Sequence, residues 1–240
     1  MDDRDKLVDF ALSQIGEHEE PLGSNRQKYG EYLDSIDWYM RDEGGKIWRH
    51  KVNGHDWCTS FVDACFNMVF SLDKAREMLF RPAMNDYGSV VKYAYEYFEK
   101  AGAIVQNPRR GDVIYFQRSG SLSHTGIIVD VNGDTLTVVE GNAGKNNCYV
   151  VMNKYKTTDS YVYGFGRPAY AASKYPDTPF KAKCTLNGVA IRSGPYSDSP
   201  IIGYVHKDDV LTIEDLDGSS GDFGLIHGYV YIPGGFDYDH

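Results

Sequence analysis

The hydrophobic positions of the chain change their period near its middle. Up to residue 102 they recur at the spacing of helices, and after Pro108 they form short continuous or alternating runs that are typical of strands. The spacing predicts helices over residues 4–16, from Cys58 onward, and over residues 89–101. Residues 41–54 have two adjacent glycines and no period, so we expect a surface loop there.

Strands are predicted at five places in the next part of the chain: residues 113–116, 124–131, 135–142, 149–152 and 161–165. A polar loop is expected at 117–123 and a turn at 132–134. Helices followed by a meander of strands indicate an α+β fold, with the helices packed on one face of an antiparallel sheet.

The composition shifts again after residue 168. Residues 169–179 are rich in Ala, Ser, Pro and Lys, which predicts a linker between a first domain, 1–168, and a second, 180–240. The second domain has turn residues about every ten positions, which predicts a small all-β barrel. Its expected strands are 182–186, 189–192, 201–205, 210–213, 224–227 and 229–232.

The predicted helix from Cys58 has its apolar residues on one stripe and begins with a cysteine in its first turn, after the start signals Gly54 and Asp56. A thiol at a helix N-terminus lies near the positive end of the helix dipole and near unpaired N–H groups, and both favour the thiolate. Cys58 is therefore a candidate nucleophile. Cys65 lies on the same face and is expected to be a core residue.

A cysteine nucleophile needs a histidine base and a polar group that orients the imidazole. The predicted hairpin supplies His124 on one strand and Glu140 and Asn142 on the other. His124 shares their face if residues 132–134 form a three-residue loop or if a bulge interrupts the pairing. A two-residue Asn-Gly turn would direct His124 to the opposite face.

Each of these residues also has a structural interpretation. A lone cysteine on a helix is more often core than catalyst, and a histidine at a strand end is more often a surface residue. Glu140 could be a solvated strand terminus, and Asn142 could serve the turn that follows it. The catalytic interpretation rests on the combination of residues.

Charge and cysteine content exclude several classes of function. The net charge of −9 argues against a nucleic-acid partner. The four cysteines form neither a Cys-x-x-Cys pair nor a Cys/His cluster, so we expect no zinc site and no dense set of disulfides. No apolar run is long enough for membrane insertion, and the acidic, polar start Met-Asp-Asp-Arg-Asp-Lys is unlike a secretory signal.

An ordered set of motifs resembles the CHAP family, the cysteine, histidine-dependent amidohydrolases/peptidases. The motifs are Asp56-Trp57-Cys58 with Phe61-Val62, Gly111-Asp112-Val113-Ile114-Tyr115-Phe116, His124-Thr125-Gly126-Ile127-Ile128-Val129 and Val138-Val139-Glu140-Gly141-Asn142. The resemblance covers about residues 5 to 170 and implies a papain-like fold. It implies Cys58 as nucleophile, His124 as base, Glu140 as the orienting residue and Asn142 as an auxiliary polar group.

We expect Asn53, Asp56 and Trp57 to bind substrate, with Asn53 as a candidate oxyanion donor. Asp34, Asp37, Asp42 and Glu43 are too loosely arranged to predict the calcium loop of some CHAP enzymes, so no metal or cofactor is expected. The C-terminal run from Thr185 to Pro195, with 201–205 and 208–213, is similar to bacterial SH3-like domains, which implies binding to the cell wall.

The resemblance implies a monomeric peptidoglycan hydrolase that cleaves an amide bond, either as an N-acetylmuramoyl-L-alanine amidase or as an endopeptidase of the stem or cross-bridge peptide. We expect a phage or prophage endolysin, made in the cytoplasm and acting on the wall after release at lysis or by another route. The alternatives are a catalytically silent wall-binding protein, a bacterial autolysin and an interbacterial amidase toxin.

Overall fold

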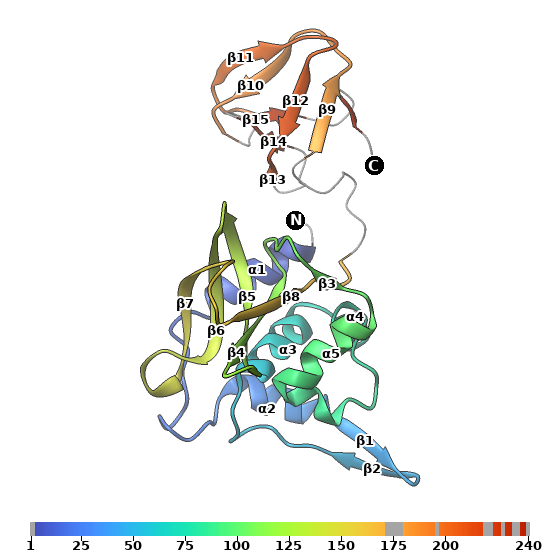
Figure 1. Cartoon of the computed structure of the whole chain (residues 1–240), viewed down its shortest axis with the longest axis vertical. Coiled ribbons are helices and arrows are strands. Elements are labelled where there is room, and N and C mark those ends of the chain that lie inside the picture. Colours follow the sequence, from blue (N-terminus) through green and yellow to red (C-terminus); the bar gives the residue numbers. More distant parts are fainter. Residues whose placement is uncertain are drawn as a thin grey trace. The chain divides into compact units, whose positions relative to one another are not determined.

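The chain divides into two units, Arg4–Ala169 and a smaller one that follows from Tyr170 (Figure 1). The structure is a computed structural model and describes residues 3–170, 180–194, 197–217, 223–226, 229–231 and 236–238. Most of the predicted linker, residues 171–179, lies outside the described residues.

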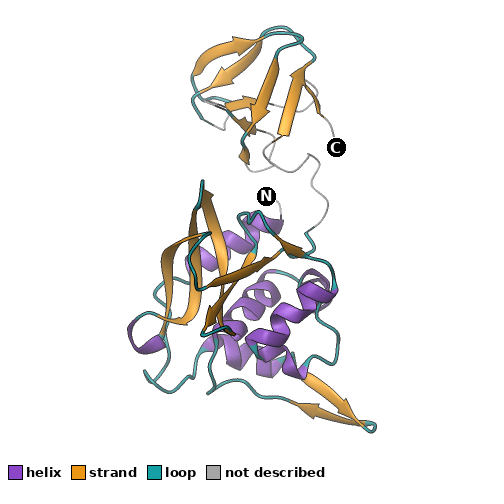
Figure 2. Cartoon of the chain, viewed as in Figure 1, coloured by secondary structure: helices purple, strands orange, loops and turns teal. Residues whose placement is uncertain are grey.

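The larger unit contains the helices, as Figure 2 shows. They are α1 (Asp3–Ser13), α2 (Lys28–Ser35), α3 (Cys58–Val69), α4 (Leu72–Met78) and α5 (Val91–Lys100), with short 3₁₀ turns η1 (Asp86–Ser89) and η2 (Lys145–Asn147). The three predicted helices are α1, α3 and α5. Helices α2 and α4 were not predicted, because they are too short to establish a period. They begin at the side-chain caps Gln27 and Ser71. Of the helices described, none is long and apolar enough to span a membrane.

One antiparallel sheet runs through the larger unit in the order β3-β8-β4-β5-β6-β7. Its strands are β3 (Ile104–Val105), β4 (Val113–Arg118), β5 (Ser121–Asn132), β6 (Thr135–Ala143), β7 (Tyr149–Lys156) and β8 (Val162–Gly166). Helix α3 packs against β5 and β6, and α5 packs against β5 and β8. The predicted α+β arrangement of this unit is confirmed.

Two predicted loops are hairpins instead. Residues 41–54 contain β1 (Met40–Glu43) and β2 (Lys46–Arg49), a two-stranded sheet joined by Gly44 and Gly45, both with positive φ. A pair of glycines in that conformation makes a tight hairpin turn, so the glycines that suggested an irregular loop are the turn itself. Likewise, β4 and β5 continue through the expected loop at 117–123 and turn at Ser119 and Gly120, also with positive φ.

Helix α3 is buried on all sides from Cys58 to Asn67, not on a single stripe as the sequence suggested. Burial therefore includes the carboxylate of Asp63, which is fully enclosed. Asp63 pairs with Arg81 (Nη2 to Oδ1, 2.8 Å) and accepts hydrogen bonds from Trp38 Nε1 (2.8 Å) and Tyr39 Oη (2.7 Å). These donors compensate the charge and fix α3 within the unit.

The smaller unit is built of strands in its described part. They are β9 (Phe180–Cys184), β10 (Val189–Arg192), β11 (Ile201–Val205), β12 (Val210–Ile213), β13 (Asp215–Asp217), β14 (Phe223–Leu225), β15 (Tyr229–Tyr231) and β16 (Phe236–Tyr238). They pair in two sheets, β11-β10-β15-β14-β13 and β12-β9-β16, around a core that includes Ala182, Cys184 and Val230. Pairing among these strands does not close a barrel, so the SH3-like barrel stays a prediction.

The buried ion pair generates a stability prediction. Asp63→Asn leaves the charge of Arg81 buried without its partner, so the free energy of unfolding should fall by about 3 to 5 kcal/mol. Tryptophan fluorescence during urea unfolding measures the effect in the larger unit alone, because all three tryptophans (Trp38, Trp48 and Trp57) lie there.

The matched control is Asp134→Asn, which breaks the exposed ion pair with Lys156. We expect no measurable change, since exposed pairs contribute little. An Asp63→Asn midpoint equal to that of the control would show that the buried pair does not stabilise the unit.

Candidate active site

Cys58 is the first residue of α3, as predicted, and its side chain is largely buried. The residue before it, Trp57, occupies the N-cap position without a side-chain hydrogen bond to the helix. The first N–H groups of a helix have no acceptor within it, and they attract negative charge. Asp56 is exposed and does not cap the helix, so it is not the start signal that the sequence suggested.

His124 lies on β5 between two partners. Its Nε2 is 2.8 Å from Oε2 of Glu140, and the Cys58 thiol is a further hydrogen-bonding partner of its side chain. Because Glu140 occupies Nε2, the nitrogen left for the thiol is Nδ1. Burial alone would lower the pKa of His124, but the contacts with Cys58 and Glu140 outweigh it and raise that pKa to about 10. The three residues form a continuous chain of polar contacts.

The face that His124 occupies depends on a β-bulge. At the turn, Asn132 pairs with Thr135, which leaves a two-residue Gly133-Asp134 loop. The register shifts between Ile128 and Asp130, so that Ile127 stands opposite Val139. Of the two arrangements that the sequence required, the bulge is the one that occurs, and it turns His124 to the face of Glu140.

Gly126 leaves the space through which Glu140 reaches His124. A Cβ at Gly126 would lie 2.8 Å from Cγ of Glu140 and 2.7 Å from Cγ1 of Val138. Contacts below 3.0 Å do not occur between such atoms without displacement. A glycine two residues after the histidine is therefore a requirement of the site.

Glu140 is 2% exposed, and both oxygens of its carboxylate are hydrogen-bonded. Besides His124, it accepts hydrogen bonds at Oε1 from Asn153 Nδ2 (3.0 Å) and Tyr155 Oη (2.7 Å). Neither donor was predicted from the sequence, because the predicted strand ended at Met152, whereas β7 continues to Lys156. Asn153 and Tyr155 are two residues apart, so on a strand they share one face. That spacing of a polar and an aromatic residue is the signal that could have identified them.

Aromatic rings support the imidazole. The ring of Phe116, on β4, stacks on His124 with centroids 5.7 Å apart, and the ring of Tyr155 packs on Phe116 at 4.8 Å. Tyr161 contacts both Phe116 and Tyr155. The orientation of His124 is thus fixed by packing as well as by hydrogen bonds.

Asn142 lies two residues beyond Glu140 at a second irregularity of β6, between Glu140 and Ala143. It is half-buried and has a φ of 56°. Asparagine tolerates this left-handed conformation better than most residues. Within the described part of the chain no hydrogen bond joins Asn142 to His124, so its auxiliary role stays a prediction.

Trp57 differs from its predicted role as a substrate-binding residue. Its side chain is completely buried, its Nε1 donates to Glu19 Oε1 (2.9 Å), and its ring stacks on Tyr29. Gly141 packs directly on it, since a Cβ there would lie 2.6 Å from Trp57 Cζ3. Trp57 therefore joins α3 to β6 and offers no surface to a ligand.

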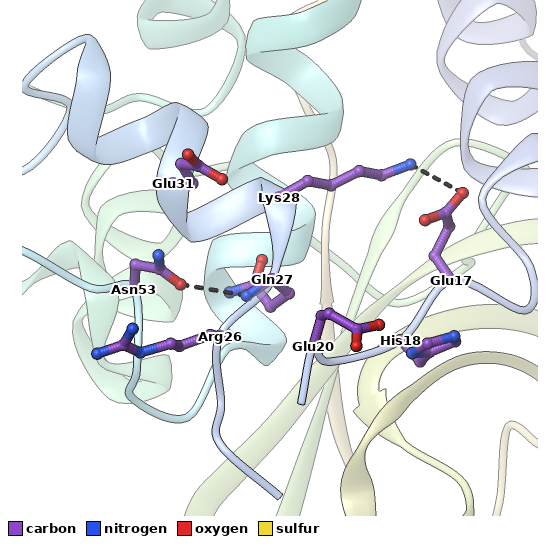
Figure 3. Close-up of a pocket in the computed structure, with 8 residues that line it drawn as sticks. All are labelled: Glu17, His18, Glu20, Arg26, Gln27, Lys28, Glu31 and Asn53. Atoms are coloured by element: carbon purple, nitrogen blue, oxygen red, sulfur yellow. Dashed lines mark hydrogen bonds and ion pairs between the residues drawn. The ribbon is translucent and has the colours of Figure 1, made fainter. Parts of the chain in front are cut away.

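Asn53 lines a pocket of about 590 Å³, together with Glu17, His18, Glu20, Arg26, Gln27, Lys28 and Glu31 (Figure 3). Its Oδ1 accepts a hydrogen bond from the Gln27 backbone N–H (3.1 Å), and its own backbone N–H donates to Asp34. The pocket contains charges of both signs, and Lys28 pairs with Glu17 across it. Cys58 and His124 are not among its lining residues.

The carboxylates considered for a calcium loop have other partners. Asp34 accepts hydrogen bonds from the backbone N–H groups of Val52 and Asn53, and Asp37 pairs with Arg49 and Lys51. Among the residues that the structure describes, no group of three or more His, Cys, Asp or Glu side chains is arranged to hold a metal ion. All four cysteines are free thiols.

Cys58, His124 and Glu140 are linked in that order by their side-chain contacts. The thiol faces a basic nitrogen, and a buried carboxylate holds the second nitrogen, which are the roles required for covalent catalysis by a cysteine. Residues 50–142 match the family model described as CHAP domain. The range that matches contains Cys58, His124, Glu140 and Asn142.

Two solved structures are similar to the chain. "The crystal structure of Ly7917" has 17% sequence identity and a TM-score of 0.42, over 95% of this chain and 92% of that chain. "The crystal structure of Ly7917 with the hydrolyzing product of MDP" has 15% identity and the same TM-score, over 98% of this chain and 97% of that chain. No curated protein matches the chain.

The raised pKa of His124 predicts that its ring loses its proton only at alkaline pH. Unfolded, its pKa is near 6.5, and folded it is about 10, so the protonated ring stabilises the fold fully below pH 6.5 and less as the pH rises through 10. Histidine NMR signals followed from pH 5 to 11 should show one ring that stays protonated through neutrality. Cys58→Ala should lower its midpoint by removing one of the two partners that raise the pKa.

The other six histidines provide the internal control, since their titration should be the same in both proteins. A His124 midpoint near 6.5 in the wild type, or one that Cys58→Ala leaves unchanged, would contradict the contact between thiol and imidazole.

Proposed function

We propose that the protein is a cysteine hydrolase that cleaves an amide bond in peptidoglycan. The observation that carries the proposal is the Cys58–His124–Glu140 chain of contacts inside the residues that match the CHAP domain. The contacts support the reaction type, because they supply a nucleophile, a proton carrier and an orienting carboxylate. The sequence resemblance to peptidoglycan hydrolases supports the substrate.

In the proposed acylation step, the Cys58 thiolate attacks the carbonyl carbon of the scissile amide. A C–S bond forms, and the carbonyl oxygen takes up negative charge. The backbone N–H of Cys58, at the start of α3, is a suitable donor to that oxygen, with Asn53 as the candidate side-chain donor. His124 then gives a proton to the amide nitrogen, the C–N bond breaks, and the amine leaves.

The deacylation step reverses these roles. His124, now neutral, takes one proton from water, and the oxygen of that water attacks the thioester carbon. The product is the carboxylic acid, which releases its proton to solvent and becomes the carboxylate. The C–S bond breaks and the thiolate returns beside the protonated imidazole. Glu140 stabilises that imidazolium in both steps, because its buried oxygen lies 2.8 Å from Nε2.

The finer parts of the proposal concern the bond and the setting. Cleavage is between muramic acid and alanine or within the stem or cross-bridge peptide, by a monomeric phage or prophage endolysin that acts on the wall after release. The strands of the smaller unit would form an SH3-like wall-binding domain. The presence of Cys58, His124 and Glu140 disfavours a silent wall-binding protein, while an autolysin or interbacterial toxin would use the same chemistry.

Clearing of purified cell walls tests the proposal. The wild type should lower the turbidity of walls from at least one species in a broad panel. Cys58→Ala and His124→Ala should abolish clearing, whereas Glu140→Ala should leave residual activity, as loss of an orienting group does. Mass spectrometry of the released fragments separates amidase from endopeptidase cleavage.

Cys65→Ala is the matched control, because Cys65 lies on the same helix but is fully buried. It should retain clearing. Walls that bind both wild type and Cys58→Ala but are cleared by neither would contradict the hydrolase and favour a binding protein.

A further inference from the structure

The second oxygen of the Glu140 carboxylate has partners that the proposed reaction does not use. Oε2 faces His124, while Oε1 accepts from Asn153 Nδ2 at 3.0 Å and from Tyr155 Oη at 2.7 Å. Glu140 is 2% exposed, so water does not replace these donors. A carboxylate buried to this degree is unfavourable unless its oxygens are hydrogen-bonded.

Both donors lie on β7, and the pairing of β7 with β6 directs them to Glu140. Asn153 stands opposite Val138 and Tyr155 opposite Leu136, so both project to the face of β6 that carries Glu140. The Asn153 amide nitrogen donates only. Burial and the nearby Glu140 carboxylate raise the pKa of Tyr155, so its hydroxyl keeps its proton and donates as well.

These contacts determine what remains for His124. With Oε1 taken by two donors, Oε2 is the oxygen available to the imidazole. It accepts from Nε2–H, which leaves Nδ1 of the neutral ring as the acceptor that faces Cys58. The imidazole nitrogen that faces the Cys58 sulfur is thus set from β7, two contacts away from the sulfur.

We propose that Tyr155 and Asn153 are positioning residues of the active site. They hold Glu140 so that its other oxygen, Oε2, orients the His124 ring and stabilises its protonated form. The role rests on the proposed function, since it concerns the same cysteine and histidine. Neither residue touches the reacting atoms, so their effect passes through Glu140.

Packing and hydrogen bonding by Tyr155 can be separated. Its ring packs on Phe116 at 4.8 Å, and Phe116 stacks on His124. Tyr155→Phe keeps that ring and removes only the hydroxyl. Tyr161 is a neighbouring tyrosine that also packs on Phe116, but its hydroxyl bonds to Asp159 at 3.2 Å and not to Glu140. Tyr161→Phe is therefore the matched control.

The groups that face His124 decide the direction of the effect. Cys58 reaches it from α3, Glu140 from β6 and the uncharged Phe116 from β4. Without the Tyr155 hydroxyl, the Glu140 carboxylate is free to turn away from His124. The imidazolium then loses the contact that raises its pKa, so the midpoint of His124 should move to lower pH.

The experiment compares wild type, Tyr155→Phe and Tyr161→Phe by wall-clearing rate against pH and by histidine NMR titration. In Tyr155→Phe we expect the maximal rate to fall about tenfold, the size of one hydrogen bond to a charged group, with half-saturation little changed. The alkaline limit of activity and the His124 midpoint should both move to lower pH. Tyr161→Phe should match the wild type in all of these measurements.

Equal behaviour of the two variants would overturn the positioning role. So would a Tyr155→Phe protein that loses activity at every pH with an unchanged His124 midpoint, because that result indicates a structural defect alone. If the wild type clears no walls, the proposed function fails. The NMR comparison still decides whether Tyr155 acts on His124.

Discussion

The enclosed carboxylate of Glu140 is the constraint on which the rest of the site depends. A buried negative charge must be hydrogen-bonded, and here the three donors come from three residues on two strands, β5 and β7. Those contacts hold β5, β6 and β7 in one register at the end where His124 lies. The bulge after Ile128 and the absence of a side chain at Gly126 are the two irregularities that allow the contact.

The position of Cys58 depends on a second buried charge. Helix α3 is enclosed over most of its length, and Asp63 on it is neutralised by Arg81 and bonded to Trp38 and Tyr39. The helix start is held by Trp57, which packs against Gly141 one residue beyond Glu140. Cys58 and the His124–Glu140 pair are therefore brought together because α3 is held firmly against the sheet.

Much of this arrangement was predictable from the sequence. The change from helical to strand-like spacing of hydrophobic residues predicts the α+β class. The combination of Cys58, His124 and Glu140 in the sequence identified three residues that the structure brings together. Asn153 and Tyr155 were missed because their role arises from pairing of β7 with β6, which local pattern does not reveal. Trp57 was predicted to bind substrate but is completely buried, because an aromatic residue next to a cysteine at a helix start suits a binding site and a core equally well. The closed barrel of the second domain stays a prediction.

The most direct test of the account is the rate at which iodoacetamide alkylates each of the four cysteines, read by mass spectrometry from pH 5 to 9 in the wild type and in His124→Ala. We predict that Cys58 is alkylated faster than the other three cysteines and that His124→Ala removes this advantage. The enclosed Cys65 should stay unmodified in both proteins. A Cys58 rate that is independent of His124 would contradict the claim that the imidazole activates the thiol.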